Sequence, residues 1–433
     1  MKQLRSCIPN VIVHAYHTLK GAGAALYYRF PARHLTVLGV TGTDGKTTTT
    51  NMLAAILRAA GTKVSWISTI SARIGTLEID TGAHTTTPSP FVLQSFLRRM
   101  VRDGDTHAIL EVTSHGIAQE RIFGISFQVA ILTNVTAEHL DYHRTYDAYL
   151  RTKVRLLQRA QARGGVAIIN RDDKSFEKVQ ALLIAGKKII TYGEHSDAKV
   201  RATDVNERSD GSDFVLHTPT GSIRVTLPIP GRFNVSNALA AASGAYALDI
   251  PLARIAEGIA SLKNLAGRME EIPTGRDFRV IVDFAHTPNA VENLLRFWRP
   301  HVKGGIIMVF GSAGERDAFK RPLMGEAAGR GADFIVLTRE DNRSESLDKI
   351  NQAIREGLAR AGKMLGHGYE VIDDRGEAIA AGIARARVGD LVLITGKGPE
   401  SGLNVDGKEI VWDDREVAKR VLGVSHYVIG STI

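Results

Sequence analysis

The chain has 433 residues, of which 44% are hydrophobic and 23% charged, an ordinary composition for a globular protein of two or three domains. Its formal charge of +9 suits a nucleotide or another anionic small substrate. We expect no nucleic-acid partner, because the sequence lacks an RNA-binding aromatic motif, a zinc finger and a lysine-rich tail. The single cysteine, Cys7, excludes a disulfide framework and a cysteine-based zinc site, and favours a reducing cytoplasm.

The first predicted helix lies in residues 11–30, VIVHAYHTLKGAGAALYYRF. Its apolar and small residues recur at roughly helical spacing, at Ile12, Tyr16, Leu19, Gly23 and Leu26. Two histidines and Lys20 make the segment too polar to span a membrane, and it does not have the pattern of a signal peptide. Two interpretations stay open: a helix packed on the following domain, or an interfacial helix in peripheral contact with a membrane.

Short apolar runs then alternate with helical stretches up to about residue 135. The runs are LTVLGV, KVSWIST, HAILEVT and VAILTNV, and they predict an α/β fold with a mainly parallel sheet. Further strands follow in VAIIN and KKIITYG, then a hairpin in FVLHTPTGSIRVTLP and a helix in GRFNVSNALAAASGAYAL. From about residue 268 a second series, RVIVDF, GIIMVFG, DFIVLT, YEVI and DLVLITG, predicts a doubly wound, Rossmann-like domain. The predicted divisions are a helical segment at 1–34, a central P-loop-type domain at 35–265 and the Rossmann-like domain at 266–433.

The loop TGTDGKT after the first strand has the composition of a phosphate-binding loop. Gly42 and Gly45 let the backbone approach phosphate oxygens, Lys46 supplies a positive charge, and the Thr47 hydroxyl can coordinate Mg²⁺. The positive end of the following helix dipole adds to this attraction. The general P-loop pattern has glycine where this chain has Val40. The predicted ATP-binding loop also includes Thr43, Asp44 and Thr48.

Acidic and histidine side chains follow two of the predicted strands. Glu111 ends the strand HAILE, where a carboxylate can coordinate a hard cation or simply cap a loop. His139 and His143 are four residues apart, which is metal-ligand spacing on a helix, although two exposed histidines would look the same.

The order of the motifs GTDGKTTT, TTP, EVTSH and TNVTAEHLDYH, followed by a lysine, resembles the Mur ligase family, and most closely its MurE type. The second half agrees in GRFNVSNALAA, GRMEEI, VDFAHTPNA, VFGSAGERDAFKRPLMG, GKGPE and WDDREVAKRVL, so the resemblance runs from about Leu35 to Leu422. The family's ATP loop is G-T-x-G-K-T, which is compatible with Val40. Related folylpolyglutamate and cyanophycin synthetases, and a non-catalytic ATP-binding scaffold of cell-wall synthesis, are the alternatives.

The resemblance implies a cytoplasmic enzyme of peptidoglycan synthesis that uses ATP to phosphorylate a carboxylate of a muramoyl-peptide nucleotide. The amine of a free amino acid then attacks the acyl phosphate. Lys46 would contact the β- and γ-phosphates, while Thr47, Glu111 and His139 would hold Mg²⁺. Lys153 matches the lysine that the family carbamylates with CO₂, which creates an anionic ligand for the metal. We expect a monomer.

The resemblance also assigns contacts with the nucleotide and with the muramoyl peptide. Nucleotide contacts are expected from Asn234, Asn237, Arg268, Asp283 and His286. Contacts with the muramoyl peptide are expected from Thr86, Thr87, Thr113, Gln119 and Arg121. MurE-type enzymes usually carry a uridine-binding domain before the ATP loop, and only about 34 residues precede the first strand here. We therefore expect weak dependence on the uridine moiety.

The expected amino-acid pocket departs from the family pattern. The family's D-N-P-R box corresponds to EDNR here, either without a gap or with Asp341-Asn342 on D-N and the proline deleted, and both alignments keep Arg343. Arg343 and Arg316 are candidates to clamp a second carboxylate. In the G-K-G-H-E motif, Pro399 replaces histidine, while Gly396 and Glu400 are kept. Diaminopimelate is the first expected amino acid and lysine the second.

Overall fold

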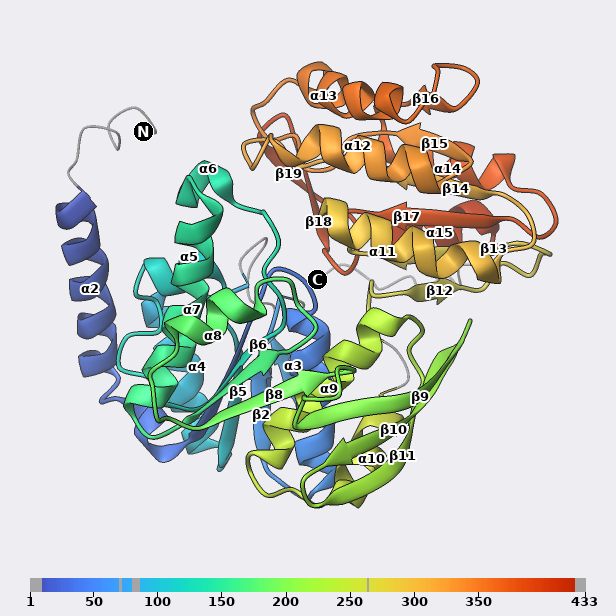
Figure 1. Ribbon diagram of the computed structural model, residues 1–433. Coiled ribbons are helices and arrows are strands. Elements are labelled where there is room, and N and C mark those ends of the chain that lie inside the picture. The colour runs from blue at the N-terminus through green and yellow to red at the C-terminus, as the bar shows by residue number, and fades with distance from the viewer. Residues whose placement is uncertain (1–9, 70–71, 80–85, 263–264, 425–433) are drawn as a thin grey trace. The chain divides into compact units, whose positions relative to one another are not determined.

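The computed structural model describes residues 10–69, 72–79, 86–262 and 265–424 of an α/β protein (Figure 1). The chain divides into two compact units. The first contains residues 1–137 and 143–263, and the second contains residues 138–142 and 264–433. No helix among the described residues is long and apolar enough to cross a membrane.

The first unit is built on an eleven-stranded sheet in the order β11-β10-β9-β8-β7-β6-β1-β5-β2-β3-β4. Its strands are β1 (Thr36–Thr41), β2 (Val64–Ile67), β3 (Ala72–Ile74), β4 (Leu77–Ile79), β5 (His107–Glu111), β6 (Phe127–Leu132), β7 (Val166–Asn170), β8 (Ile189–Gly193), β9 (Val200–Arg208), β10 (Gly211–Thr218) and β11 (Gly221–Leu227). The strands from β2 to β9 in this order pair in parallel, while β3-β4 and β10-β11 add antiparallel edges. The prediction of an α/β fold with a mainly parallel sheet is confirmed.

Nine helices that lie wholly in the first unit among the described residues are α2 (Asn10–Tyr27), η1 (Pro31–His34), α3 (Lys46–Ala59), α4 (Pro90–Arg102), α5 (Ser114–Ala118), α7 (Tyr146–Ala162), α8 (Phe176–Leu182), α9 (Arg232–Tyr246) and α10 (Leu252–Ala260). The short helix α6 (Leu140–His143) follows the loop after β6. Small residues let α9 pack closely on the sheet, and a Cβ at Gly244 would lie 2.9 Å from Ile131 Cδ1. Helix α9 therefore packs on the sheet at short range near β6.

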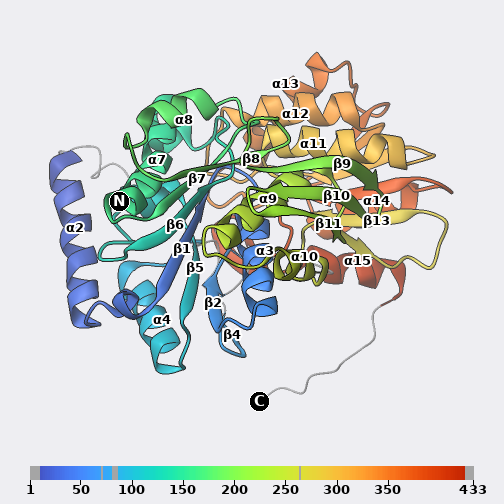
Figure 2. The same cartoon turned by 60° about the horizontal axis from the view of Figure 1, so that its bottom comes forward.

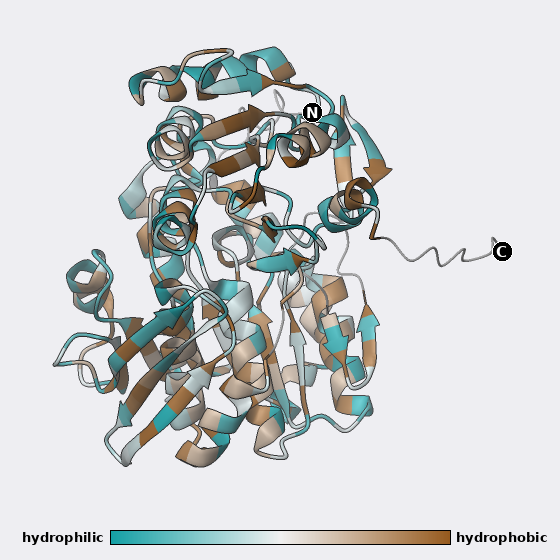
Figure 3. Ribbon diagram, turned by 90° about the vertical axis from the view of Figure 1, so that its right-hand side faces the viewer, coloured by the Kyte–Doolittle hydropathy of each residue, from teal (hydrophilic) through white to brown (hydrophobic). Residues whose placement is uncertain are grey.

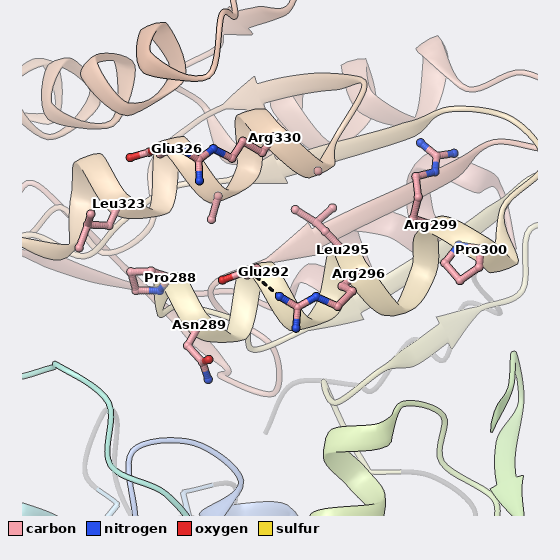
Figure 4. A pocket seen from close by; sticks show the side chains of 12 residues that line it. Pro288, Asn289, Glu292, Leu295, Arg296, Arg299, Pro300, Leu323, Glu326 and Arg330 are labelled. Atoms are coloured by element: carbon pink, nitrogen blue, oxygen red, sulfur yellow. Dashed lines mark hydrogen bonds and ion pairs between the residues drawn. The ribbon is translucent and has the colours of Figure 1, made fainter. Parts of the chain in front are cut away.

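The second unit has a six-stranded sheet in the order β12-β13-β17-β14-β15-β16, parallel except for β12. Its elements are β12 (Glu270–Ile272), β13 (Arg279–Asp283), α11 (Pro288–Trp298), η2 (Arg299–His301), β14 (Ile306–Phe310), α12 (Lys320–Gly331), β15 (Phe334–Leu337), α13 (Leu347–Arg360), β16 (Tyr369–Val371), α14 (Arg375–Arg385), β17 (Leu391–Thr395), β18 (Gly402–Val405), β19 (Lys408–Val411) and α15 (Asp414–Leu422). Every residue of β14, β15 and β17 is buried, and Figure 3 shows hydrophobic residues concentrated on such strands. The predicted doubly wound domain is thus confirmed as a fold.

Candidate active site

The loop between β1 and α3 has a backbone that only glycine can adopt at two positions. Gly42 has φ +150° and Gly45 has φ +80°. A Cβ on Gly42 would lie 1.8 Å from Thr133 Oγ1, and a Cβ on Gly45 would lie 2.1 Å from Asn237 Oδ1. Because side chains are excluded there, the loop brings bare backbone to the N-terminus of α3, as an anion cradle requires.

The loop is held by the residues that follow β6. The amide of Thr43 donates to Asn134 O and the amide of Asp44 to Asn134 Oδ1, both at 2.9 Å. Thr133 Oγ1 donates to Asp44 O at 2.6 Å. Lys46 Nζ donates to Thr43 O at 2.8 Å, so its ammonium group lies over the loop. Thr48 is buried in the first turn of α3, and its predicted contact with ATP stays a prediction.

Glu111 meets the first turn of α3 at the carboxyl end of β5. Its carboxylate accepts hydrogen bonds from Thr47 Oγ1 at 3.0 Å, and from the amide and the hydroxyl of Thr69, each at 2.9 Å. Glu111 is only 2% exposed. The sequence-predicted pair of Thr47 and Glu111 is therefore together in the structure, and hydroxyl and carboxylate oxygens are the ligands that Mg²⁺ prefers.

Lys153 reaches the same loop from α7. Its side chain is 2% exposed, its Nζ donates to Gly42 O at 2.5 Å, and Nζ lies 4.5 Å from the centroid of the Tyr149 ring. The Tyr149 hydroxyl lies 3.1 Å from Thr43 Oγ1. The helix thus delivers an amine to the phosphate-binding loop, although the two are far apart in the sequence.

The two asparagines of α9 lie at the other side of this loop. Asn237 Nδ2 donates to Asn234 Oδ1 at 3.1 Å, and Asn234 Nδ2 donates to Pro230 O at 2.7 Å. Asn237 also limits the space beside Gly45. Both residues are buried, so their predicted contact with adenine would be made at the edge of an ordered network.

The predicted muramoyl-peptide contacts join the Glu111 network through hydroxyl groups. Thr86 Oγ1 lies 3.0 Å from Thr69 Oγ1. Thr87 Oγ1 donates to Glu111 O at 3.1 Å and lies 3.1 Å from Thr113 Oγ1. These residues come from segments after β2, β4 and β5, and the fold brings them together.

Arg121 lies close to the same network. Its Nη1 donates to Thr87 O at 2.5 Å, while its Nε and Nη2 donate to Gln119 Oε1 at 3.0 and 2.7 Å. The predicted group of Thr87, Gln119 and Arg121 is therefore one cluster, but its contacts with a substrate stay a prediction.

His139 and His143 do not share a helix, so neither of the two interpretations, a metal pair or two exposed helical histidines, describes them. His139 has φ +56° and precedes α6, which begins at Leu140. The His143 ring packs near His115 and Tyr149, with centroids 5.7 and 5.3 Å away. Burial, and then the charge of Lys153, lower the pKa of His143 to about 4. His143 is therefore a neutral packing residue at neutral pH, and His139 alone stays a predicted ligand.

Glu138 is the centre of a charged cluster in the second unit. It is 4% exposed, and its Oε1 lies 3.4 Å from His286 Nε2 and 3.6 Å from Lys320 Nζ. Lys320 Nζ also donates to His286 O at 2.8 Å. Burial alone would raise the pKa of Glu138, but the charge of His139 and the contacts with His286 and Lys320 hold it well below its ordinary value. The predicted nucleotide contact His286 is thus fixed by an ionised carboxylate.

Asp283 and Arg268 lie beside each other in the same unit. Asp283 accepts hydrogen bonds from the amides of Met269 and Ala285, each at 2.8 Å. Burial raises the pKa of Asp283, and the charge of Arg268 opposes that rise. The Arg268 guanidinium lies 4.4 Å from the centroid of the Phe284 ring. Their predicted contact with the nucleotide stays a prediction.

Two arginines approach each other where the amino-acid pocket is expected. Burial, and then the charge of Arg343, lower the pKa of Arg316. Arg343 has φ +53°, and its Nη1 donates to Gly314 O at 2.8 Å. Asn342 Nδ2 donates to Asp406 Oδ1 at 2.7 Å. Two like charges that repel each other would both be stabilised by an anion bound near them.

Glu400 and Asp341 share a buried lysine that sequence reasoning did not single out. Lys397 Nζ lies 2.8 Å from Asp341 Oδ1 and 2.5 Å from Glu400 Oε2. Burial lowers the pKa of Lys397, but the charges of Glu400 and Asp341 outweigh it, and the pKa is raised. Gly396, with φ +107°, passes so close to Glu340 that a Cβ would lie 2.9 Å from Glu340 Oε2. An ammonium ion of a substrate would compete with Lys397 for Glu400.

Other functional candidates were also missed from the sequence. They are Thr69, Tyr149, Glu138 and Lys320. Thr69 follows a strand end, which is a weak signal, and Lys320 lies in a quoted motif. Glu138 lies in the quoted motif TNVTAEHLDYH. Tyr149 gave no signal of its own, because its partner Thr43 is distant in the sequence.

Comparison with known proteins places this geometry in a family. A family model described as the Mur ligase middle domain matches residues 40–245, and one described as the Mur ligase glutamate ligase domain matches residues 267–398. The UDP-N-acetylmuramyl-tripeptide synthetase of Roseiflexus sp. (strain RS-1) is 39% identical over 415 residues, which are 93% of this chain and 82% of that protein. The chain belongs to the Mur ligase family. This Mur ligase is an ATP-dependent amide ligase.

Another relative of the Mur ligase is the UDP-N-acetylmuramoyl-L-alanyl-D-glutamate–2,6-diaminopimelate ligase of Caldanaerobacter subterraneus subsp. tengcongensis. It is 38% identical over 422 residues, which cover 96% of this chain and 85% of that protein. A solved structure of a ligase with that name is 32% identical, has a TM-score of 0.60, and is matched over 91% of this chain and 79% of its own. The folylpolyglutamate synthase of Mycobacterium tuberculosis, at 17% identity and a TM-score of 0.73 over 94% of this chain and 95% of its own, shows the shared fold alone.

Proposed function

We propose that this Mur ligase joins meso-diaminopimelate, or lysine as the second choice, to a UDP-N-acetylmuramoyl-dipeptide-like acceptor in the cytoplasm. ATP phosphorylates the acceptor carboxylate to an acyl phosphate, and the amine of the amino acid displaces phosphate to form the amide. ADP and phosphate are the other products. The names of the relatives support the acceptor and the first choice of amino acid.

One observation carries the proposal: Thr47, Glu111 and Lys153 lie at the loop between β1 and α3 and at the first turn of α3. Thr47 Oγ1 contacts Glu111 at 3.0 Å, and Lys153 Nζ contacts the carbonyl of Gly42 at 2.5 Å. A phosphate cradle with a hydroxyl, a carboxylate and an amine at its edge can position a nucleoside triphosphate and stabilise the charge that moves during phosphoryl transfer. Lys46, folded over the loop, is placed to contact the β- and γ-phosphates.

We propose that Lys153 acts as a carbamate, since a buried amine beside a carbonyl can react with CO₂ in its neutral form. The C–N bond forms as the amine loses a proton, and the product is an anionic oxygen donor. Thr47, Glu111 and carbamylated Lys153 would together hold Mg²⁺, which when bound neutralises phosphate charge. The burial of Lys153 keeps competing water away from this group.

The choice of diaminopimelate over lysine rests on Arg316 and Arg343. Each guanidinium can bind a carboxylate through two parallel hydrogen bonds, and lysine has no second carboxylate to offer. Burial and the charge of Arg343 lower the pKa of Arg316, while the charges of Asp141, Glu400 and Asp341 oppose that change. A ligand carboxylate beside them would therefore gain two cationic partners.

The test is a phosphate-release assay with UDP-N-acetylmuramoyl-L-Ala-D-Glu and, separately, meso-diaminopimelate, lysine or ornithine. We expect release only when acceptor and amino acid are both present, and fastest with diaminopimelate. Arg343→Ala should raise the KM for diaminopimelate by about tenfold to a hundredfold, as expected for loss of a charge-assisted contact. Arg360→Ala, on the exposed end of α13, is the matched control. If none of the amino acids tried supports phosphate release, the proposed ligase activity is contradicted. An unchanged KM in Arg343→Ala would remove Arg343 from the pocket.

A further inference from the structure

Helix α2 presents an apolar face to solvent. Six of its large apolar side chains are 58–79% exposed: Val11, Ile12, Tyr16, Leu19, Leu26 and Tyr27. Ile12, Tyr16, Leu19 and Leu26 are spaced by four, three and seven residues, which places them on one side of the helix. We call these four residues the α2 apolar face. Figures 1 and 2 both show α2 at the outer edge of the first unit.

The opposite side of α2 is anchored, so the helix cannot rotate to bury this face. Gly21, Ala24 and Ala25 are buried. A Cβ on Gly21 would lie 2.7 Å from both Glu120 O and Phe123 Cβ, so the helix backbone approaches that turn at close range. The small residues of the C-terminal half thus determine which side of α2 points outward.

The N-terminal half of α2 is mostly exposed, and only Val13, His17 and Thr18 are partly buried there. None of residues 11–20 is buried. A helical stretch of this length is marginally stable in water when nothing packs against it. A surface that accepts Ile12, Tyr16 and Leu19 would remove their apolar area from water and stabilise the helix at the same time.

The charge around the helix indicates what that surface is. The first 43 residues contain five Lys and Arg and no Asp or Glu, because the first acidic residue of the chain is Asp44. Lys20 follows Tyr16 by four residues and so lies next to it on the helix surface. Arg29 and Arg33 are exposed just after the helix. An apolar face bordered by cations complements an anionic lipid surface, where acyl chains and phosphates lie within a few ångströms of each other.

We propose that α2 docks this ligase on an anionic lipid bilayer, with the α2 apolar face in the headgroup region and Lys20, Arg29 and Arg33 near lipid phosphates. The helix lies in the plane of the interface, in agreement with the finding that no described helix can cross a membrane. Docking rests on the outer side of α2 and does not depend on the amino-acid specificity proposed above.

The test is co-sedimentation of the full chain with vesicles. Wild-type protein should sediment with vesicles that contain phosphatidylglycerol, and the bound fraction should fall at least about fivefold with pure phosphatidylcholine or at high salt. The double variant Ile12→Asp, Leu19→Asp should lose binding to a similar extent and keep the ligase activity and the unfolding temperature of the wild type. Val388→Asp, at an apolar residue of the second unit that is 79% exposed, is the matched control and should bind as the wild type does.

Two results would overturn the proposal. One is equal sedimentation of the wild type and the double variant with anionic vesicles, including no sedimentation of either. The other is self-association of the wild type without lipid, seen by light scattering and abolished in the double variant, which would assign the face to a second copy of the chain. Lys20→Glu, which changes charge without touching the apolar face, should weaken binding to anionic vesicles only.

Discussion

The side chain of Lys153 extends from α7 to the phosphate loop, where it contacts the carbonyl of Gly42, 111 residues away in the sequence. Lys153→Ala should lower kcat at least about a hundredfold, because the proposed carbamate ligand is lost. Acetate or another short-chain carboxylate should restore part of the rate by occupying the vacated space. Lys187→Ala, an exposed lysine of the same unit, should have no effect. A Lys153→Ala enzyme of normal rate would show that Lys153 is outside the catalytic machinery.

The lowered pKa of His143 predicts how the free energy of unfolding depends on pH. While Lys153 is an uncarbamylated cation, the pKa of His143 is about 4 in the folded chain against an ordinary value of 6.5, so the unfolded chain binds the proton first as pH falls. The stability that neutral His143 contributes is complete above pH 6.5 and is lost as the pH drops towards 4. By pH 5 this loss amounts to about 2 kcal/mol relative to pH 7.5.

The measurement is urea unfolding of the wild type and of His143→Gln at the two pH values. The wild type should lose about 2 kcal/mol more than the variant, since glutamine does not titrate and the carboxylates titrate in both chains. An equal loss in both would show that His143 has an ordinary pKa in the folded state.

At the scale of the element, the glycines of the β1–α3 loop have neighbouring atoms where a Cβ would lie, whereas some other left-handed glycines face open space. Gly45 and Gly61 have similar φ values, +80° and +77°, but a Cβ meets Asn237 at the first and open space at the second. Gly61→Ala should therefore cost about 1 kcal/mol of stability through backbone strain alone. Gly45→Ala adds a steric clash and should also weaken ATP binding by about tenfold or more. Calorimetric titration with ATP checks this, and equal affinities in the two variants would contradict it.

Elements with continuous apolar runs were predictable from the sequence, and short exposed ones were not. β1, β5, β14 and β17 are buried strands whose runs are read directly from the residues. The hairpin of β18 and β19 was missed because every residue of β19 is exposed, so no apolar pattern identifies it. His139 and His143 do not share a helix for a local reason, since the left-handed backbone of His139 keeps it out of α6.

The same limit applies to the candidate site. Residues inside a recognisable motif, such as Lys46 and Thr47, were predictable because the chemistry is local in the sequence. Lys397 and Glu138 lie in the quoted motifs GKGPE and TNVTAEHLDYH but were not singled out, because their importance comes from partners that only the fold brings near: Asp341 for Lys397 at 2.8 Å and His286 for Glu138 at 3.4 Å. A buried ion pair leaves no periodic signal in the residues that form it.

At the scale of the whole molecule, each of the two units contains some of the proposed site residues. The first contains the phosphate loop, Glu111 and Lys153, and the second contains the paired arginines and the Lys397 cluster. Each unit has its own sheet and its own buried core. In the proposed reaction the acyl phosphate is readily hydrolysed, so the amine must attack it before it leaves the enzyme.

The most direct measurement labels the acceptor carboxylate with ¹⁸O and follows the label by mass spectrometry. If the carboxylate is phosphorylated and the amine then displaces phosphate, one ¹⁸O atom per turnover appears in the released phosphate, and the new amide keeps the other. We expect this transfer only when ATP, the muramoyl-dipeptide acceptor and the amino acid are all present. Amide product with no ¹⁸O in the phosphate, or phosphate released without amide product, would contradict the account.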